Sequence, residues 1–208
     1  PRFTIGVEEE YFVVDRTTRD LVPDLPDDLK KALEHPPVGM TSPEFLRSQV
    51  EIGTPVSRDV SELTEYLGTR RRFVSDVVSE HGMAIIAASP HPVAIWADQR
   101  HTDKERYRLL EQALQGVIRR LLICGMHVHV EVADEDLRID LMNQVSYFLP
   151  HILALSGSSP FWEGDDTGLK SYRPAGFRGL PRTGIPDEFN DWSEYQRHVN
   201  VLVKTGVI

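Results

Sequence analysis

The chain has 208 residues, of which 40% are hydrophobic and 26% charged, and its formal net charge is −9. The acidic balance argues against a nucleic-acid-binding surface, because the one basic cluster (residues 69–73, TRRRF) lies in a helical pattern beside acidic residues and is expected to be a solvated face. A single cysteine, Cys124, excludes an internal disulfide and fits a reducing compartment. No apolar run approaches the roughly 20 residues of a membrane span and no signal-peptide pattern is present, so we expect a cytoplasmic protein.

The first predicted element is a strand over residues 3–14 that contains three consecutive glutamates. Side chains alternate between the two faces of a strand, so Glu8 and Glu10 share one face and Glu9 points the other way, with Val7 and Tyr11. Two like charges on one face need a positive partner, either an Arg or Lys side chain or a divalent cation. The alternative is an edge strand whose glutamates face water.

Residues 15–43 are rich in Pro and Asp, which indicates an exposed excursion with one short helix at 27–34. The segment 45–55 (FLRSQVEIGTP) predicts a second strand that ends at Pro55 and carries Gln49 and Glu51 on one face. Glu44 precedes this strand and needs a bulge or turn to reach the same site. The alternative for Glu44 is a surface acid beside a loop.

Helical and strand periods alternate through the rest of the chain. Ser57 is the expected N-cap of a long helix that Gly82 ends. Cys124 is expected to be a buried, inert thiol. Further predicted elements are a strand at 83–89, a loop at 90–103, a helix at 104–123, a strand at 126–132, a helix at 135–156 kinked by Pro150, a Gly- and Pro-rich segment at 157–190 and a helix at about 192–204. This order favours an α+β fold with an antiparallel or mixed sheet, formed as one domain over residues 1–208.

The strand at 126–132 carries functional residue types on one face. His127, His129 and Glu131 alternate with apolar residues, and two imidazoles with a carboxylate can bind a metal or position an oxyanion. A solvent-facing polar stripe is the alternative.

Taken together, three predicted strands each place acids or histidines on one face of a sheet. A concave sheet lined mostly with carboxylates would hold divalent cations, and Mg²⁺ or Mn²⁺ suits such ligands better than a structural Zn²⁺. These ions commonly bind nucleotide phosphates, yet the sequence has no Walker motif, GxGxxG loop or kinase signature. An ATP site would therefore depend on metals and arginines.

The arginines for such a site lie in a Gly-rich segment at 165–186. Lys170, Arg173, Arg178 and Arg182 are expected on an irregular loop, where guanidinium groups can recognise carboxylate or phosphate. The alternative is a solvated loop.

Five blocks in order carry a family resemblance: GVEEEYFVVD, PEFLRSQVEIGTPV, CGMHVHVEV, LALSGSSPFWEGDDTGLKSYR and LPRTGIP. Together they resemble the glutamate–cysteine ligase type 2 family, bacterial carboxylate–amine ligases of the glutamine synthetase superfamily. The resemblance implies a curved, mostly antiparallel sheet with flanking helices, of the glutamine synthetase/guanido kinase type. It also implies an ATP-dependent reaction, in which a glutamate-like carboxylate is converted to an acyl phosphate and attacked by a cysteine-like amine.

The resemblance also assigns roles to residues of this chain. It implies that Glu8, Glu10, Glu44, Glu51 and His127 bind metal, and that His127 and Arg173 act in catalysis. Arg173 is also expected to bind ATP, together with Arg178 and Arg182 of the same Gly-rich segment. His129 matches less securely, because related ligases vary there, and Glu9 would be structural.

Family members are much longer than 208 residues, so the resemblance covers their N-terminal portion. The chain is then expected to be a fragment, or to be completed by a second chain or by homo-oligomerisation, because a lone half would expose sheet edges and apolar surface. Two other functions stay open at this point. One is a Zn²⁺-dependent hydrolase using His127, His129 and Glu131, and the other is a non-catalytic subunit of a split ligase.

Overall fold

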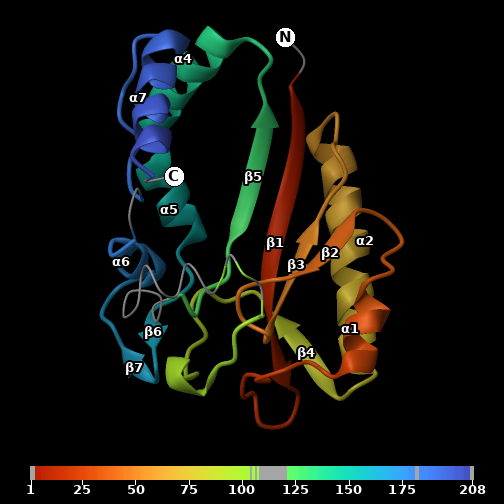
Figure 1. The fold of residues 1–208 in the computed structure, drawn as a ribbon. Coiled ribbons are helices and arrows are strands. Elements are labelled where there is room, and N and C mark those ends of the chain that lie inside the picture. The colour runs from red at the N-terminus through yellow and green to blue at the C-terminus, as the bar shows by residue number, and fades with distance from the viewer. Residues whose placement is uncertain (1–2, 104, 106, 108–120, 181–182, 207–208) are drawn as a thin grey trace. The chain divides into compact units, whose positions relative to one another are not determined.

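The computed structural model describes residues 3–103, 105, 107, 121–180 and 183–206. The chain forms two compact units (Figure 1), one comprising Pro1–Val130 with Ser158–Arg182 and the other Glu131–Gly157 with Thr183–Ile208. The predicted α+β class is confirmed, since the first unit contains an antiparallel sheet with helices packed against it. The expectation of a single catalytic domain stays a prediction. Within the described residues, no helix is long and apolar enough to cross a lipid bilayer.

The sheet of the first unit is built around β1 (Thr4–Asp15). Its order is β2–β3–β1–β4, formed by β2 (Met40–Pro43), β3 (Gln49–Gly53) and β4 (Met83–Ile86), and these neighbouring strands pair antiparallel. A further strand, β5 (Met126–Glu131), also pairs with β1 and runs in the opposite direction beside it (Figure 1). Because β1 has neighbours on both sides, the alternative of a solvated edge strand is wrong.

One face of the sheet packs against helices α1 (Asp27–Leu33) and α2 (Val60–Ser79). Val13, Val50 and Ile52 from the strands form a buried cluster with Val74 and Val78 of α2. The apolar residues of α2 recur at helical spacing, which places them on the side that faces the sheet. This packing leaves the even-numbered residues of β1 on the opposite face.

The opposite face divides into an apolar part and an acidic part along β1. Phe12 and Val14 belong to a second buried cluster with Phe45 and Leu122, close to the short 3₁₀ helix η1 (Trp96–Asp98). Cys124 lies in the same cluster, and its burial raises the thiol pKa well above the ordinary value. The prediction of a buried, inert thiol is therefore confirmed.

Glu9 points into the helix face, as the strand alternation predicts. Its side chain is only 7% exposed and pairs with Arg71 of α2, and the Tyr11 hydroxyl also donates to it. Burial raises the pKa of Glu9, but the hydrogen bonds from Arg71 and Tyr11 outweigh burial and hold it below its usual value. The expectation that residues 69–73 form a solvated face is thus wrong in part, because Arg70 is fully buried and Arg71 is the partner of Glu9.

Several predicted boundaries differ from the structure for local reasons. The N-cap of α2 is Asp59, whose carboxylate accepts from the Glu62 N–H, while Ser57 pairs through its backbone with Ile5. The segment 45–55 forms a strand only at 49–53, and 40–43 of the expected excursion forms β2. The predicted strand 83–89 ends at Ile86. The helix expected at 104–123 falls mostly outside the described residues, and 121–125 are not helical.

The second unit contains α4 (Glu135–Ser146), α5 (Leu149–Ser156) and α7 (Trp192–Lys204). The single kinked helix expected at 135–156 is wrong: the helix ends at Ser146, and Pro150 lies in the first turn of α5, where its missing N–H costs no hydrogen bond. The last helix is confirmed. The Arg138 guanidinium lies 5.0 Å from the Trp192 ring centroid and so contributes to the contact of α4 with α7.

His81, just after α2, is expected to make the stability of the first unit pH-dependent. Its Nε2 lies 3.2 Å from Asp28 Oδ2 and its Nδ1 3.2 Å from the Val77 carbonyl, so two acceptors raise its pKa above 6.5, with Asp28 contributing most. A histidine whose pKa is raised in the folded state stabilises that state fully at pH values below its pKa in the unfolded chain. This stabilisation is lost as the pH rises through the pKa of the folded state. The destabilisation caused by His81→Gln should therefore be larger at about pH 6 than at about pH 8 in urea unfolding. An Asp28→Asn variant whose His81 titrates by NMR at the same pH as in the parent would contradict this.

Candidate active site

The acidic part of the β1 face brings together residues from distant parts of the first unit. Glu10 lies opposite Glu51 in the β1–β3 pairing, and the Gly125 N–H donates to Glu10 Oε2 over 2.9 Å. Burial, followed by the charge of Glu44 and then that of Glu51, raises the pKa of Glu10 to about 7, whereas the Gly125 N–H and Arg173 lower it. The charges of two further carboxylates and one guanidinium thus all act on Glu10.

Glu51 lies on the face opposite the helices, as its position in β3 predicts. The Ser42 hydroxyl of β2 donates to Glu51 Oε2 over 2.8 Å, which fixes the orientation of the carboxylate. This contact was absent from the sequence-based expectations because β2 itself was not predicted.

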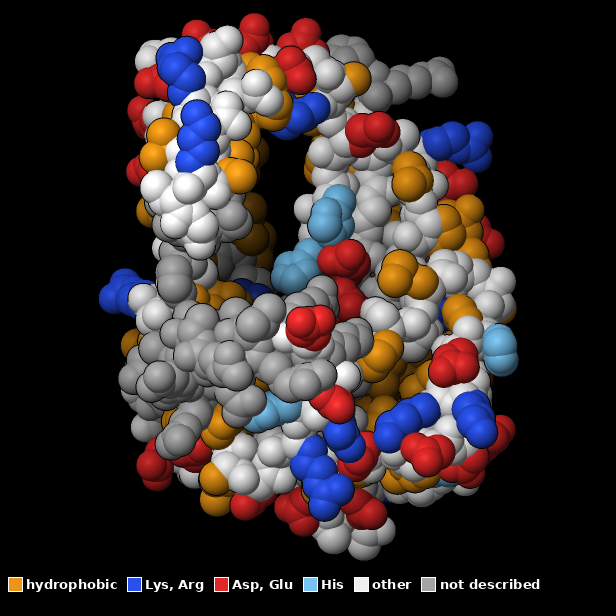
Figure 2. Space-filling view, in the orientation of Figure 1, with side chains coloured by type: hydrophobic (Ala, Val, Ile, Leu, Met, Phe, Trp, Pro, Cys, Tyr) orange, Lys and Arg blue, Asp and Glu red, His pale blue; other side chains and the backbone are white. Residues whose placement is uncertain are grey.

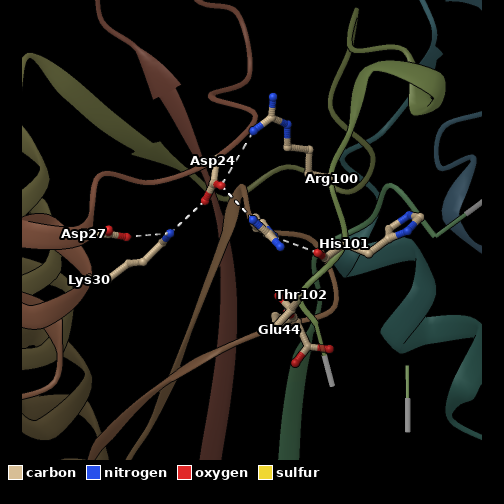
Figure 3. Close-up of polar contacts among 8 residues, drawn as sticks. Asp24, Asp27, Lys30, Glu44, Arg100, His101 and Thr102 are labelled. Atoms are coloured by element: carbon tan, nitrogen blue, oxygen red, sulfur yellow. Dashed lines mark hydrogen bonds and ion pairs between the residues drawn. The ribbon is translucent and has the colours of Figure 1, made fainter. Parts of the chain in front are cut away.

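Glu44 lies in the loop before β3, its charge contributes to the raised pKa of Glu10, and neighbouring loops fix its backbone. The Thr102 hydroxyl donates to the Glu44 carbonyl, and the Tyr107 hydroxyl lies 3.4 Å from Glu44 Oε2. Figure 3 shows the surrounding network, in which Arg47 donates to Asp24 over 2.9 Å and to the His101 carbonyl over 2.7 Å. These contacts tie the loop before β3 to residues 101–102.

The same network completes the surroundings of Asp24. Lys30 of α1 lies 2.8 Å from Asp24, and Arg100 lies 3.9 Å away (Figure 3). Burial raises the Asp24 pKa, but the hydrogen bonds from Lys30 and Arg47 outweigh it and lower the pKa overall. Asp24 therefore anchors α1 and the two loops that position Glu44.

Arg173 is the predicted arginine that the structure places beside the acids. It begins the short helix α6 (Arg173–Phe177) and is not part of an irregular loop, and its guanidinium lies 4.4 Å from the Phe177 ring centroid. Its Nε is buried and has no hydrogen-bond partner among the residues that the structure describes. A Cβ atom on Gly125 would lie 2.9 Å from Arg173 Nη2, so the glycine provides the space that the guanidinium occupies.

Glu8 lies on the same face and contacts the histidines of β5. Its Oε2 is 3.1 Å from His129 Nε2 and 3.5 Å from His127 Nδ1. Histidine side chains lie beside acidic side chains in the space-filling view (Figure 2). All three side chains are more than one-third exposed, so this part of the site is open to solvent.

The structure does not place the remaining predicted residues beside this group. Lys170 and Arg178 are exposed, and no described contact links them to the acids. Arg182 lies outside the described residues, and Glu131 ends β5 in the second unit. In the part of the chain that the structure describes, no three His, Cys, Asp or Glu side chains form a group that could hold a metal ion. The metal-binding roles therefore stay predictions.

A family model described as glutamate-cysteine ligase family 2 matches residues 4–208. The chain belongs to this family. A Rhodospirillum rubrum protein named "Putative glutamate--cysteine ligase 2" is 57% identical over 215 residues, which cover 100% of this chain and 54% of that protein. A Paracoccus denitrificans protein of the same name is 51% identical, over 100% of this chain and 55% of that protein. The family resemblance is confirmed, and the chain spans about half the length of the curated family members it matches.

Two solved structures share the fold of this glutamate–cysteine ligase family 2 chain. A bifunctional glutathione synthetase from Pasteurella multocida superposes with a TM-score of 0.77 over 98% of this chain and 30% of that protein, at 16% identity. A glutamate–cysteine ligase from Francisella tularensis, solved in complex with AMP, superposes with a TM-score of 0.60 over 76% of this chain and 36% of that protein, at 18% identity. At these identities the likeness supports the fold alone.

Proposed function

We propose that the chain supplies part of the active site of an ATP-dependent ligase that joins a glutamate-like carboxylate to a cysteine-like amine. The observation that carries the proposal is that Glu10 lies opposite Glu51 in the sheet of a glutamate–cysteine ligase family 2 chain, where the charges of Glu44, Glu51 and Arg173 all act on it. The Francisella tularensis ligase of similar fold was solved with AMP, which supports adenine nucleotide as a substrate.

The residue types suit Mg²⁺ or Mn²⁺, although no three of the described His, Cys, Asp or Glu side chains are grouped closely enough in this structure to hold an ion. The three interacting carboxylates carry more negative charge than Arg173 neutralises, and the raised pKa of Glu10 reflects that excess together with burial. Carboxylate oxygens are preferred ligands of hard divalent cations. Glu8, Glu10, Glu44, Glu51 and His127 would hold such cations, which supply charge neutralisation at the ATP phosphates.

Arg173 is suited to bind a reacting phosphate or carboxylate oxygen. Phe177 and Gly125 restrict its guanidinium, and its buried Nε retains an unused N–H donor. A positioned donor of this kind stabilises charge that develops during phosphoryl transfer. Arg178 and Arg182 are proposed as further ATP contacts that would require the segment after α6 to approach the site.

The proposed reaction has two steps. The substrate carboxylate attacks the γ-phosphate of ATP and forms an acyl phosphate with release of ADP, and the amine then displaces phosphate to form the amide. In this chain Arg173 would orient the transferring group, and His127, whose Nδ1 lies 3.5 Å from Glu8, would help position the metal-binding carboxylate.

The hydrolase alternative is not favoured by the family assignment. Its histidines, His127 and His129, both contact Glu8 within a site whose other members are carboxylates. Tightly held zinc in the purified protein would nevertheless support it, since two imidazoles with a carboxylate form a typical catalytic zinc ligand set.

The test is ADP and amide formation by the family-length protein with Mg-ATP, glutamate and a panel of amines. Hydroxylamine in place of the amine should trap the acyl phosphate as a hydroxamate. A folded family-length protein that releases no ADP with any amine would overturn the ligase proposal, and would favour the non-catalytic subunit.

Gly125→Ala is expected to lower ligase activity about tenfold with little loss of stability. The new Cβ would displace the Arg173 guanidinium, which is the mobile end of a long side chain and can move at small energetic cost. Gly6→Ala on β1 is the matched control, because a Cβ there would meet no atom within 4 Å. Both variants should unfold at similar temperatures while only Gly125→Ala loses activity. Equal activity of the two would show that Arg173 is not held for catalysis.

A further inference from the structure

Gln49 is a buried polar residue of β3 that neither the proposed metal sites nor the proposed ATP contacts use. It is only 4% exposed and lies opposite Phe12 in the β1–β3 pairing. Phe12 and the nearby Leu46 belong to an apolar cluster. A primary amide in such surroundings is unfavourable unless its polar atoms form hydrogen bonds, whereas an apolar side chain of the same size has no such requirement. The hydrogen bonds of Gln49 therefore indicate what the residue does.

The amide group of Gln49 connects two backbone segments that are far apart in the sequence but belong to the same unit. Its Oε1 accepts from the Leu46 N–H over 3.2 Å, and its Nε2 donates to the Ile123 carbonyl over 2.6 Å. Because Leu46 offers a donor and Ile123 an acceptor, only one orientation of the amide satisfies both. The loop before β3 and the segment 123–125 are thus held at a fixed separation by one side chain, whose burial keeps water from replacing these bonds.

Both segments carry residues of the candidate active site. Glu44 lies in the first segment, and Gly125 ends the second. Gly125 is joined to Glu10 in both directions, because its N–H donates to Glu10 Oε2 over 2.9 Å and its carbonyl accepts from the Glu10 N–H over 3.0 Å. A Cβ at Gly125 would lie 2.9 Å from Arg173 Nη2, so a displacement of Gly125 changes the space available to that guanidinium. Gln49 therefore connects the backbone that carries Glu44 to the backbone that borders Glu10 and Arg173.

We propose that Gln49 is a positioning residue, which holds the loop that carries Glu44 at a fixed separation from Gly125. It is buried and acts through the backbone, not by contact with substrate. Through Gly125 it acts on Glu10 and Arg173, and so on the geometry in which the proposed metal-binding carboxylates and the guanidinium meet ATP. The catalytic consequence rests on the proposed ligase function, whereas the link between the two segments does not.

The test compares Gln49→Met with two matched variants in the family-length protein. Methionine has a length and volume similar to those of glutamine but makes neither hydrogen bond. Gln99→Met is the control for the change of residue type, because Gln99 Nε2 donates to the Ile95 carbonyl only four residues earlier in the chain. Arg71→Met is the control for lost stability, because it removes the partner of Glu9 on the face of the sheet that packs against the helices.

Hydrogen exchange measures the positioning without any substrate. In the parent protein the Gly125 N–H donates to Glu10, and Gln49→Met should increase its exchange rate by at least about tenfold. The N–H of Val22, which donates to the backbone of β1, reports any general loss of stability and should change much less. Arg71→Met should not accelerate exchange at Gly125 more than at Val22.

Steady-state kinetics measures the catalytic consequence at a temperature where all variants are folded. Gln49→Met should lower kcat about tenfold and raise the Mg²⁺ concentration that gives half the maximal rate, because the carboxylates and Arg173 no longer align. Gln99→Met and Arg71→Met should keep the parental values of both.

Two results would overturn the positioning role of Gln49. One is unchanged exchange at Gly125 in folded Gln49→Met, and the other is faster exchange with the kcat of Arg71→Met, since Gln49 would then be structural only. Gln49→Asn carries the same expectations if Gln49→Met does not fold, because its shorter amide can reach one segment at most. A parent protein that releases no ADP would be a failure of the ligase function, and exchange at Gly125 distinguishes it from a failure of the link because it needs no substrate.

Discussion

Glu10→Gln is expected to reduce ATP-dependent amide formation by at least about 100-fold while making the folded protein more stable. Glu10 combines burial with the nearby charges of Glu44 and Glu51, and these raise its pKa to about 7. Its ionised form is therefore unfavourable in the metal-free protein, and a neutral amide of the same shape removes that cost. The amide oxygen can still accept from the Gly125 N–H.

Both the activity and the free energy of unfolding are measured for the parent protein and the variant. In EDTA at about pH 8, Glu10→Gln should raise the free energy of unfolding by about 1–2 kcal/mol. Adding Mg²⁺ and ATP should stabilise the parent protein more than the variant, because a ligand stabilises only the state that binds it. A variant that unfolds more easily than the parent in EDTA would show that Glu10 is a structural ion-pair partner.

Arg71→Met is expected to have the opposite effect on stability, with a loss of about 2–3 kcal/mol. It removes the partner of Glu9, whose side chain is 7% exposed, and leaves a buried carboxylate with only the Tyr11 hydroxyl. The expected loss is below that of a fully buried pair because Arg71 is itself 53% exposed and partly screened by water. Urea unfolding at neutral pH measures it.

Two further variants test the cause of that loss. Arg72→Met changes the next residue of α2, which is exposed, and should alter stability by less than about 0.5 kcal/mol. The double variant Glu9→Gln with Arg71→Met should recover part of the loss, since no buried charge remains. If Arg71→Met and Arg72→Met are equally stable, water solvates Glu9 and the ion pair contributes little.

Glu9 and Glu10 show which structural features the local sequence pattern can predict. Adjacent residues of a strand point to opposite faces, so the sequence was sufficient to predict that Glu8 and Glu10 differ in surroundings from Glu9. The same reasoning predicted that Glu51 lies opposite Val50 and Ile52, and that His127 and His129 share a face. Each of these predictions needs only the backbone geometry of a single strand.

Positions that depend on contacts between distant segments could not be predicted in this way. The Gly125 N–H donates to Glu10 across 115 positions of sequence, and the absence of a side chain at Gly125 leaves space for Arg173. Glu44 is held by Thr102, from a predicted loop, and by Tyr107, from a predicted helix, and neither prediction indicates a contact with Glu44. Arg70 and Arg71 belong to one basic cluster in the sequence, and only the packing of α2 shows that one is buried and the other pairs with Glu9.

The sequence alone determined the family, the α+β class and the faces of the strands, because ordered motifs and period-two alternation are properties of short segments. The tertiary structure decided which charges act on Glu10, where Arg173 lies and which distant segments Gln49 connects. The physical reason is that charge interactions and burial depend on distances between segments far apart in the chain, and these distances are set only when the whole fold packs.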